Sequence, residues 1–260
     1  MKLAGKVAVI TGTASGSGKA TALLFASQGA LVLGIDQDQD GGRETARRIK
    51  AEGGQADFFH ADLGLESGVR ESASFCLSRS SAIDILFNNA GILARSNFVE
   101  TSFDEWQRHI AIHLTAPFLL SQLLVTAMAG RQASIIHHGT IDGTLGNPMS
   151  AAYSASKGGL VPLTHVMAQT LGPMGIRVNC ICSAGIRTSE SDIIIRLTPE
   201  LRAGEIMSDM QRRVTPLGRA GTVEEIARVA RFLACGDSSY VNGSVITVDG
   251  GRSGLTQGTF

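Results

Sequence analysis

Short apolar runs alternate with longer amphipathic stretches along the whole chain. The apolar runs are rich in Val, Ile and Leu, a composition typical of strands that are buried on both faces. They predict strands at 6–11, 30–35, 56–60, 83–87, 134–138, 176–181 and 244–248. The stretches between them predict helices from about 18 to 29 and at 41–52, 66–78, 103–128, 151–171 and 223–234. This alternation predicts an α/β fold with a doubly wound, seven-stranded parallel sheet and helices on both faces.

A glycine-rich loop joins the first strand to the first helix. Gly12, Gly16 and Gly18 stand there among small residues that include Ser15 and Ser17. Glycines let the backbone turn sharply and approach a pyrophosphate, whose charge then faces the amino-terminal end of the helix. The loop therefore predicts a dinucleotide site, and the alternative is a tight turn without a ligand. The residues expected on the inner face of the helix are Ala20, Leu23, Leu24 and Ser27.

An aspartate ends the second strand. Asp36 lies eighteen residues after Gly18, close to the spacing of about 20 at which an acid meets the adenosine ribose. Its carboxylate would accept hydrogen bonds from ribose hydroxyls and repel a 2′-phosphate. No lysine or arginine lies between Thr11 and Gly18. We therefore expect NAD as the cofactor, not NADP.

Two further strand ends carry candidate ligand-binding residues. Asp62 and Leu63 follow the third strand, where the carboxylate can accept from an adenine amino group or cap a helix; both readings stay open. Asn89, Ala90 and Gly91 follow the fourth strand, a position where ligands bind in open α/β sheets. The asparagine can bridge adjacent loops, and the small residues leave room for a flat ring. A simple turn is the alternative.

A tyrosine and a lysine stand four residues apart near the start of a predicted helix. Tyr153 and Lys157 therefore share one helix face. A phenol has a pKa near 10, and a neighbouring cation lowers that pKa by favouring the phenolate. Such a pair can exchange a proton near neutral pH. The alternative is an ordinary helix face with an extended lysine.

Charge and cysteine content limit the classes of partner. The 23 basic and 23 acidic residues balance, with a pI near 7.0, so the composition gives no reason to expect nucleic acid or an anionic membrane as partner. The four cysteines, which show no Cys-x-x-Cys spacing, are expected to be reduced thiols without a metal site. We expect no signal peptide, because residues 1–5 lead straight into a predicted strand, and no apolar run that reaches the roughly 18 residues of a membrane span. We expect a cytoplasmic protein with one domain over 1–260.

Four motifs in register resemble the classical short-chain dehydrogenase/reductase family. They are Thr-Gly-x-x-x-Gly-x-Gly at 11–18, Asn-Asn-Ala-Gly at 88–91, Tyr-x-x-x-Lys at 153–157 and Val-Asp-Gly-Gly at 248–251. The resemblance covers nearly the whole chain. It implies a Rossmann-type domain, a nicotinamide cofactor and hydride transfer to or from the carbon of a secondary alcohol.

The resemblance also implies roles for individual residues. Tyr153 would be the acid/base, and Lys157 would lower its pKa and hold the nicotinamide ribose. Thr140, thirteen residues before the tyrosine, would orient the substrate oxygen. The Ile186 backbone and Thr188 would contact the nicotinamide end of the cofactor.

The chain departs from the family pattern at several positions. Thr140 stands where serine is usual, and Ser17 where isoleucine is usual. Ser183 and Ala184 replace a common Pro-Gly pair, which changes the backbone preferences of that turn. His113 replaces an asparagine that helps to hold a proton-relay water. Whether His113 joins a relay or only packs in its helix stays open.

Substrate and assembly are the least determined features. The segment 189–216 is rich in Ile, Leu and Met and is expected to form a substrate lid for a mainly apolar alcohol or ketone; packing against the core is the alternative. The resemblance leads us to expect a homotetramer, with 245–260 packed between subunits. Rival functions are an NADPH-dependent carbonyl reductase and a nucleotide-sensing protein with weakened catalysis.

Overall fold

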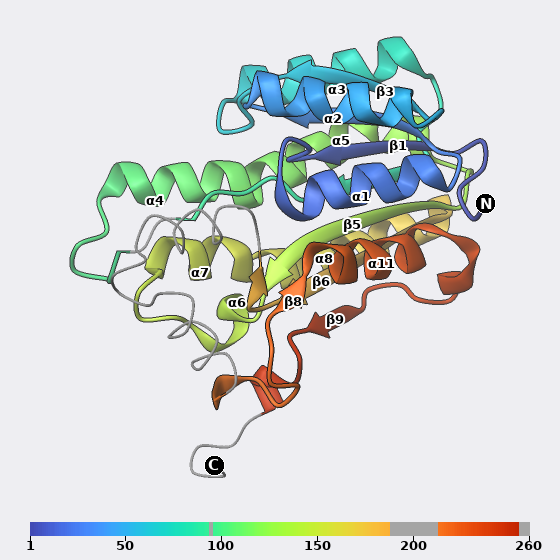
Figure 1. The fold of residues 1–260 in the computed structure, drawn as a ribbon. Coiled ribbons are helices and arrows are strands. Elements are labelled where there is room, and N and C mark those ends of the chain that lie inside the picture. The colour runs from blue at the N-terminus through green and yellow to red at the C-terminus, as the bar shows by residue number, and fades with distance from the viewer. Residues whose placement is uncertain (94–95, 188–212, 255–260) are drawn as a thin grey trace.

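A seven-stranded parallel sheet forms the centre of the molecule (Figure 1). The structure is a computed structural model that describes residues 1–93, 96–187 and 213–254. The strands run in the order β3-β2-β1-β4-β5-β6-β9, and every neighbouring pair is parallel. Their bounds are β1 Val7–Thr11, β2 Leu31–Asp36, β3 Gln55–His60, β4 Ile85–Asn88, β5 Ala133–Thr140, β6 Ile176–Ser183 and β9 Val245–Val248.

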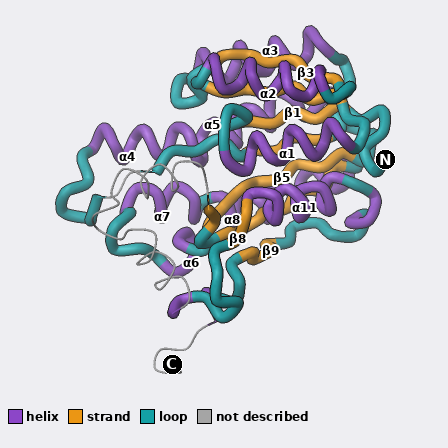
Figure 2. The backbone as a smooth tube through the Cα atoms, in the orientation of Figure 1, coloured by secondary structure: helices purple, strands orange, loops and turns teal. Residues whose placement is uncertain are grey.

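Helices connect the strands and cover the sheet (Figure 2). They are α1 Gly16–Ser27, α2 Gln39–Ala51, α3 Glu66–Arg79, α4 Phe103–Ile110, α5 Ala116–Met128, α6 Asp142–Leu145, α7 Ala151–Gly158, α8 Leu160–Leu171 and α11 Val223–Ala234. Between α4 and α5 lies one π-helical segment, η1 (Ala111–Thr115), and the short 3₁₀ segments are η2 Gly172–Met174, η4 Gly236–Ser238 and η5 Arg252–Gly254. Two short strands, β7 (Ile186–Arg187) and β8 (Gly221–Thr222), pair separately from the main sheet. The predicted α/β class and the seven strands are confirmed.

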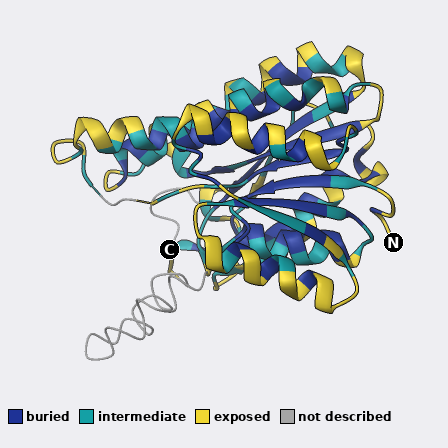
Figure 3. Cartoon of the chain, turned by 90° about the horizontal axis from the view of Figure 1, so that it is seen from above, coloured by how far each residue is buried: buried dark blue, intermediate teal, exposed yellow. Residues whose placement is uncertain are grey.

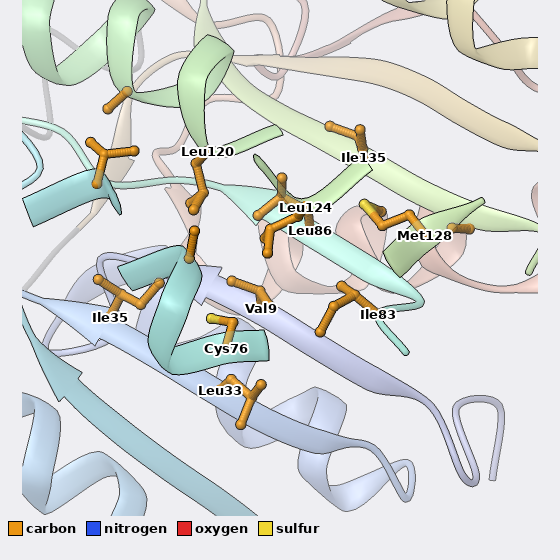
Figure 4. Close-up of a cluster of buried hydrophobic side chains, with 14 of the residues drawn as sticks. Val9, Leu33, Ile35, Cys76, Ile83, Leu86, Leu120, Leu124, Met128 and Ile135 are labelled. Atoms are coloured by element: carbon orange, nitrogen blue, oxygen red, sulfur yellow. The ribbon is translucent and has the colours of Figure 1, made fainter. Parts of the chain in front are cut away.

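Two apolar clusters fill the space between the sheet and its helices. One lies under α3, α5 and α8, and Figure 4 shows Leu120, Leu124 and Met128 of α5 against Val9 and Leu86 of the sheet. The other lies under α1 and α11 on the opposite face and includes fully buried Phe25 and Leu233. Figure 3 shows the buried strands between helices whose outer faces are exposed. Burying one large apolar side chain contributes about 1.5–3 kcal/mol, so these clusters account for most of the drive to fold.

The strand order reverses between β1 and β4. From β1 the chain moves outward through β2 and β3, and it then returns to β4 on the other side of β1. The loops after β1 and β4 therefore diverge at the carboxyl ends of the strands, where open α/β sheets bind ligands. The Gly12 loop and Asn89 both lie at this point.

The helical stretch Phe103–Met128 runs through α4, η1 and α5. It contains a window of mean hydropathy 1.7 that is long and apolar enough to cross a membrane by length and composition, and 39% of that window is buried. The expectation that no apolar run reaches that length was therefore wrong. In the fold, Leu120, Leu124 and Met128 pack into the core, as in the central helix of a folded domain.

The predicted helix 151–171 is divided at Gly159 into α7 and α8. A Cβ atom at Gly159 would lie 2.8 Å from a methyl group of Leu114, and one at Gly158 would lie 2.6 Å from the Gly143 carbonyl oxygen. The absence of side chains therefore lets the end of α7 pack closely against η1 and α6. This close packing brings the face of α7 that carries Tyr153 and Lys157 to the end of β5.

Candidate active site

A cavity of about 390 Å³ opens at the carboxyl ends of the central strands. It runs from the loop after β2 to the face of α7. Most of the residues predicted to bind a cofactor line it, and these are Gly12, Ser15, Gly16, Ser17, Asp36, Asp62, Leu63, Asn89, Ala90, Gly91, Tyr153 and Lys157. The sequence motifs, which are far apart along the chain, therefore meet at one site.

The glycine loop is held by close contacts to its neighbours. Gly12 has a φ of +77°, and a Cβ atom there would lie 2.7 Å from Nδ2 of Asn89. The same Nδ2 donates to the Thr11 carbonyl oxygen at 2.9 Å, so Asn89 bridges the loops after β1 and β4 as predicted. Gly18 does not line the cavity; a Cβ there would collide with the Gly12 carbonyl oxygen, so this glycine lets α1 approach the loop.

The first turn of α1 faces the cavity. Ser15 is its N-cap residue and makes no side-chain capping hydrogen bond. Backbone N–H groups at the start of a helix lack intrahelical partners and carry partial positive charge. With the glycine backbone and the cavity beside them, these groups fit the pyrophosphate of a dinucleotide.

The Asp36 carboxylate is fixed in the cavity by two backbone donors. Oδ2 accepts from the Ala14 N–H at 2.8 Å, and Oδ1 accepts from the Asp38 N–H at 2.9 Å. Each oxygen keeps a free lone pair for a ribose hydroxyl. Asp38 and Asp62 line the same part of the cavity, so three carboxylates gather there.

Asp62 is paired with an arginine. Its Oδ1 accepts from Arg108 at 2.8 Å and from the Gly64 N–H at 2.8 Å. Partial burial acts to raise the pKa of Asp62, but these two donors outweigh it and hold the pKa below its usual range. The N-cap residue of α3 is Leu65, so Asp62 is not the helix cap that was one alternative.

Tyr153, Thr140 and Lys157 meet at the other end of the cavity. Burial raises the pKa of Tyr153 to about 12, and a hydrogen bond to the Thr140 side chain opposes that rise. The Lys157 ammonium donates to the His138 carbonyl oxygen at 2.6 Å. The predicted lowering of the Tyr153 pKa by Lys157 is therefore not found here, because the ammonium is bonded elsewhere and burial dominates.

His113 is fully buried, and both of its ring nitrogens are hydrogen-bonded. The Ile92 N–H donates to Nε2 at 3.0 Å, so the ring proton is on Nδ1, which donates to the Ser156 hydroxyl at 2.9 Å. Burial, with the Lys157 charge second, lowers the pKa of His113 to about 2. The imidazole connects the cavity loop to α7 and leaves no ring nitrogen for a relay water, so this geometry favours the packing role.

Other predicted positions lie outside the cavity lining. The Thr140 side chain is hydrogen-bonded to Tyr153, and the His113 ring lies 5.4 Å from the Tyr153 ring, so both residues contact the site through that tyrosine. Ile186 lies in β7 and packs against the core, and Thr188 and most of the lid 189–216 lie outside the described residues. Lining residues that the sequence reasoning did not place there are Ala14, Gln37, Asp38, Ala61, Ile92, Leu93, Ile112, His138, Gly139 and Ser183. Most of them are neighbours of motif residues at strand ends, which is the signal that was available.

Comparisons with known proteins agree with this geometry. A family model described as enoyl-(acyl carrier protein) reductase matches residues 12–253. An uncharacterized oxidoreductase of Bacillus subtilis (strain 168) is 41% identical over 98% of this chain and 93% of its own length. The trans-4-hydroxycyclohexanecarboxylate dehydrogenase of Sinomonas cyclohexanicum is 34% identical over 97% of this chain and 94% of its own.

A solved structure extends the comparison to the fold. The L-sorbose reductase of Gluconobacter frateurii, complexed with NADPH and L-sorbose, is 29% identical and matches with a TM-score of 0.93. The match covers 98% of this chain and 100% of the reductase chain. Together with the four motifs and the cavity in which they meet, these matches show that the chain belongs to the short-chain dehydrogenase/reductase family.

Proposed function

We propose that this protein is an NAD-dependent oxidoreductase that interconverts a secondary alcohol and a ketone. The observation that carries the proposal is one cavity with the Asp36 carboxylate at one end and Tyr153 with Lys157 at the other. The name of the Sinomonas relative, a hydroxycyclohexanecarboxylate dehydrogenase, supports a secondary alcohol as substrate.

In this proposal the protein contributes positioning and proton transfer. A bound nicotinamide cofactor supplies the hydride acceptor or donor. Thr140 and Tyr153 hold the substrate oxygen between their hydroxyl groups, and Tyr153 takes or returns its proton as the general acid/base. Lys157 lies in the same cavity; turning its ammonium from the His138 carbonyl oxygen toward the phenol would lower the pKa of Tyr153.

Charge supports NAD over NADP. Asp36, Asp38 and Asp62 line the adenosine end, while the described lining residues include Lys157 and no arginine. A 2′-phosphate beside Asp36 would therefore be repelled by its carboxylate, and the nearby Arg108 guanidinium is already paired with Asp62. The second candidate is an NADPH-dependent carbonyl reductase, because the Gluconobacter structure contains NADPH.

The cofactor proposal is tested by titrating the protein with NADH and NADPH. We expect NADH to bind at least tenfold more tightly, and Asp36→Ser to remove most of that preference by lifting the repulsion of the 2′-phosphate. Asp40→Ser, on the exposed first turn of α2 and outside the cavity lining, is the matched control. Equal binding of both dinucleotides by the native protein would contradict the proposal.

A screen of secondary alcohols with NAD⁺ tests the reaction itself. Appearance of NADH absorbance identifies an enzyme, whereas dinucleotide binding without turnover on any alcohol or ketone would favour a nucleotide sensor. Apolar Ile92, Leu93 and Ile112 line the cavity and support a mainly apolar substrate. The lid at 189–216 and the contacts from Ile186 and Thr188 belong to the proposal on the strength of the family resemblance.

Assembly into a homotetramer is also part of the proposal. Phe103, Trp106 and Phe118 expose apolar surface on α4 and α5, and β9 is the last strand of the sheet among the described residues. Exposed apolar patches and strand edges are commonly covered by another chain. A cytoplasmic location is supported by four buried cysteines, all of them free thiols.

A further inference from the structure

His138 links three strand ends in the wall of the cavity. Its Nδ1 lies 2.9 Å from Oδ1 of Asn89, which follows β4, and its Nε2 lies 3.0 Å from Oγ of Ser183, the last residue of β6. The ring stacks on Phe87 with centroids 5.9 Å apart. Asn89, His138 and Ser183 all line the cavity.

The amide of Asn89 determines which ring nitrogen of His138 carries the proton. Its Nδ2 donates to the carbonyl oxygens of Thr11 at 2.9 Å and Gly12 at 3.4 Å, which can only accept. Oδ1 must therefore face His138, and Nδ1 of the ring must donate to it. Burial, followed by the Lys157 charge, lowers the pKa of His138 to about 3, so the ring is neutral at physiological pH.

A neutral ring with its proton on Nδ1 has a lone pair on Nε2. The Ser183 hydroxyl must then donate its single proton to His138. Only lone pairs remain on the Ser183 oxygen for a molecule in the cavity. A serine hydroxyl can usually donate or accept a hydrogen bond, but toward the cavity the Ser183 hydroxyl can only accept one.

We propose that His138 is a positioning residue that makes Ser183 a dedicated hydrogen-bond acceptor for the dinucleotide. The inference rests on the proposed function, since it takes the ligand to be a nicotinamide dinucleotide. Ser183 ends β6 next to β5, whose Thr140 bonds Tyr153, so it lies at the proposed nicotinamide end. The ligand groups that offer an N–H or O–H donor there are the carboxamide amino group and the ribose hydroxyls.

The hydrogen-bond direction is tested without any ligand. In protein labelled with ¹⁵N-histidine, nitrogen chemical shifts report the tautomer, and the signal lost in His138→Asn assigns the ring. We expect the Nδ1–H tautomer with no titration between pH 5.5 and 8.5. A proton on Nε2, or titration within that range, would overturn the proposal.

Binding of NADH, followed by fluorescence, tests the consequence. Ser183→Ala removes the acceptor, and His138→Asn keeps a donor toward Asn89 but offers Ser183 no matching acceptor. We expect each variant to bind NADH about fivefold to tenfold more weakly. Because the two residues act in one chain of hydrogen bonds, the double variant should lose little more than either single variant. His165→Asn, at an exposed position of α8, is the control.

The outcomes separate this inference from the proposed function. If Ser183→Ala and His138→Asn both bind NADH as tightly as the native protein does, the role of His138 is overturned and the proposed function still stands. Failure of the native protein to bind either NADH or NADPH would overturn the proposed function and, with it, the ligand named here. An analogue with an acetyl group in place of the carboxamide lacks the N–H donor. If the carboxamide is the partner of Ser183, Ser183→Ala leaves the binding of this analogue unchanged. If a ribose hydroxyl is the partner, Ser183→Ala weakens the binding of NADH and of the analogue equally.

Discussion

Lys157 carries a positive charge into a buried position. Its side chain is 6% exposed, and burial lowers its pKa from 10.5 to about 8. The ammonium has one described hydrogen-bond acceptor, the His138 carbonyl oxygen. A buried cation without a carboxylate beside it destabilises the folded state. Buried charges with shifted pKa values of this kind are typical of functional sites.

The sign of the pH effect follows from the lowered pKa. Between about pH 8 and 10.5 the unfolded chain still binds the Lys157 proton while the folded chain has released it, so stability gains with rising pH in this window. The destabilisation is complete below pH 8 and amounts to at most about 3 kcal/mol. We expect Lys157→Met to raise the melting temperature at pH 7 by a few degrees, and by less at pH 9.5.

Thermal unfolding at both pH values measures this difference, with Lys50→Met on exposed α2 as control. An equal gain at both pH values, or a loss at pH 7, would contradict the assignment of a buried charge to Lys157.

The positions of the site residues were easier to predict than their pKa values and hydrogen-bond partners. Asp36, Asn89 and Lys157 could be placed at one site because the carboxyl ends of parallel strands share one edge. The pKa of Tyr153 could not be predicted, because it depends on burial and on which acceptor the lysine chooses. The role of His113 was likewise open until its two partners were known.

At the scale of elements, η1 places His113 between the loop after β4 and α7. A π-helical turn widens the helix locally, and such turns are frequent at functional sites. Through Ile92 and Ser156, the imidazole fixes the loop that lines the cavity against the helix that carries Tyr153. This side chain therefore helps to fix the geometry of the site, together with the close packing of α7 at Gly158 and Gly159.

His113→Ala should cost about 2–4 kcal/mol of stability, because it leaves the Ile92 N–H without its partner and opens space in a buried position. It should also weaken NADH binding. Melting temperature and NADH titration measure the two effects, with His165→Ala on α8 as control. Loss of turnover with unchanged melting temperature and unchanged NADH binding would instead support a proton relay through His113.

The type of the main strands and helices was predictable, but short elements such as α6, β7 and β8, the buried helix faces and the helix breaks were not. The expected inner face of α1 was only partly right: Leu23 packs against the core, but the fully buried residues of that face are Ala22 and Phe25, and Leu24 is only partly buried. Small and apolar residues surround that helix, which packs against α11 as well as the sheet, so periodicity alone could not choose the face. The break at Gly159 depends on close contacts to η1 and α6 that no local pattern shows.

For the molecule as a whole, the apolar surface on α4 and α5 bears on assembly. Phe103 is 71% exposed and Phe118 is 47% exposed, with Trp106 between them in sequence. We expect light scattering to give the mass of a tetramer for the native protein, and Trp106→Glu to reduce it by placing a charge in the contact. Leu65→Glu, at an exposed position before α3, is the control. A native monomer would contradict this expectation.

Fold and site location were predictable at this scale because buried strands, glycine loops and motif order are local signals that parallel topology brings together. Subunit contacts in the proposed tetramer would depend on the surfaces of two chains, and the proposed substrate preference involves residues that are distant in sequence and meet only in the fold, so neither follows from local pattern.

The most direct test of the account is Tyr153→Phe, assayed with an alcohol identified in the screen. Thr140 and Lys157 stay in place, and only the hydroxyl that transfers the proton is removed. We predict that turnover falls by about 10³-fold while NADH affinity stays within about threefold of the native value. Turnover within tenfold of the native rate would contradict the proposal that Tyr153 is the acid/base of this site.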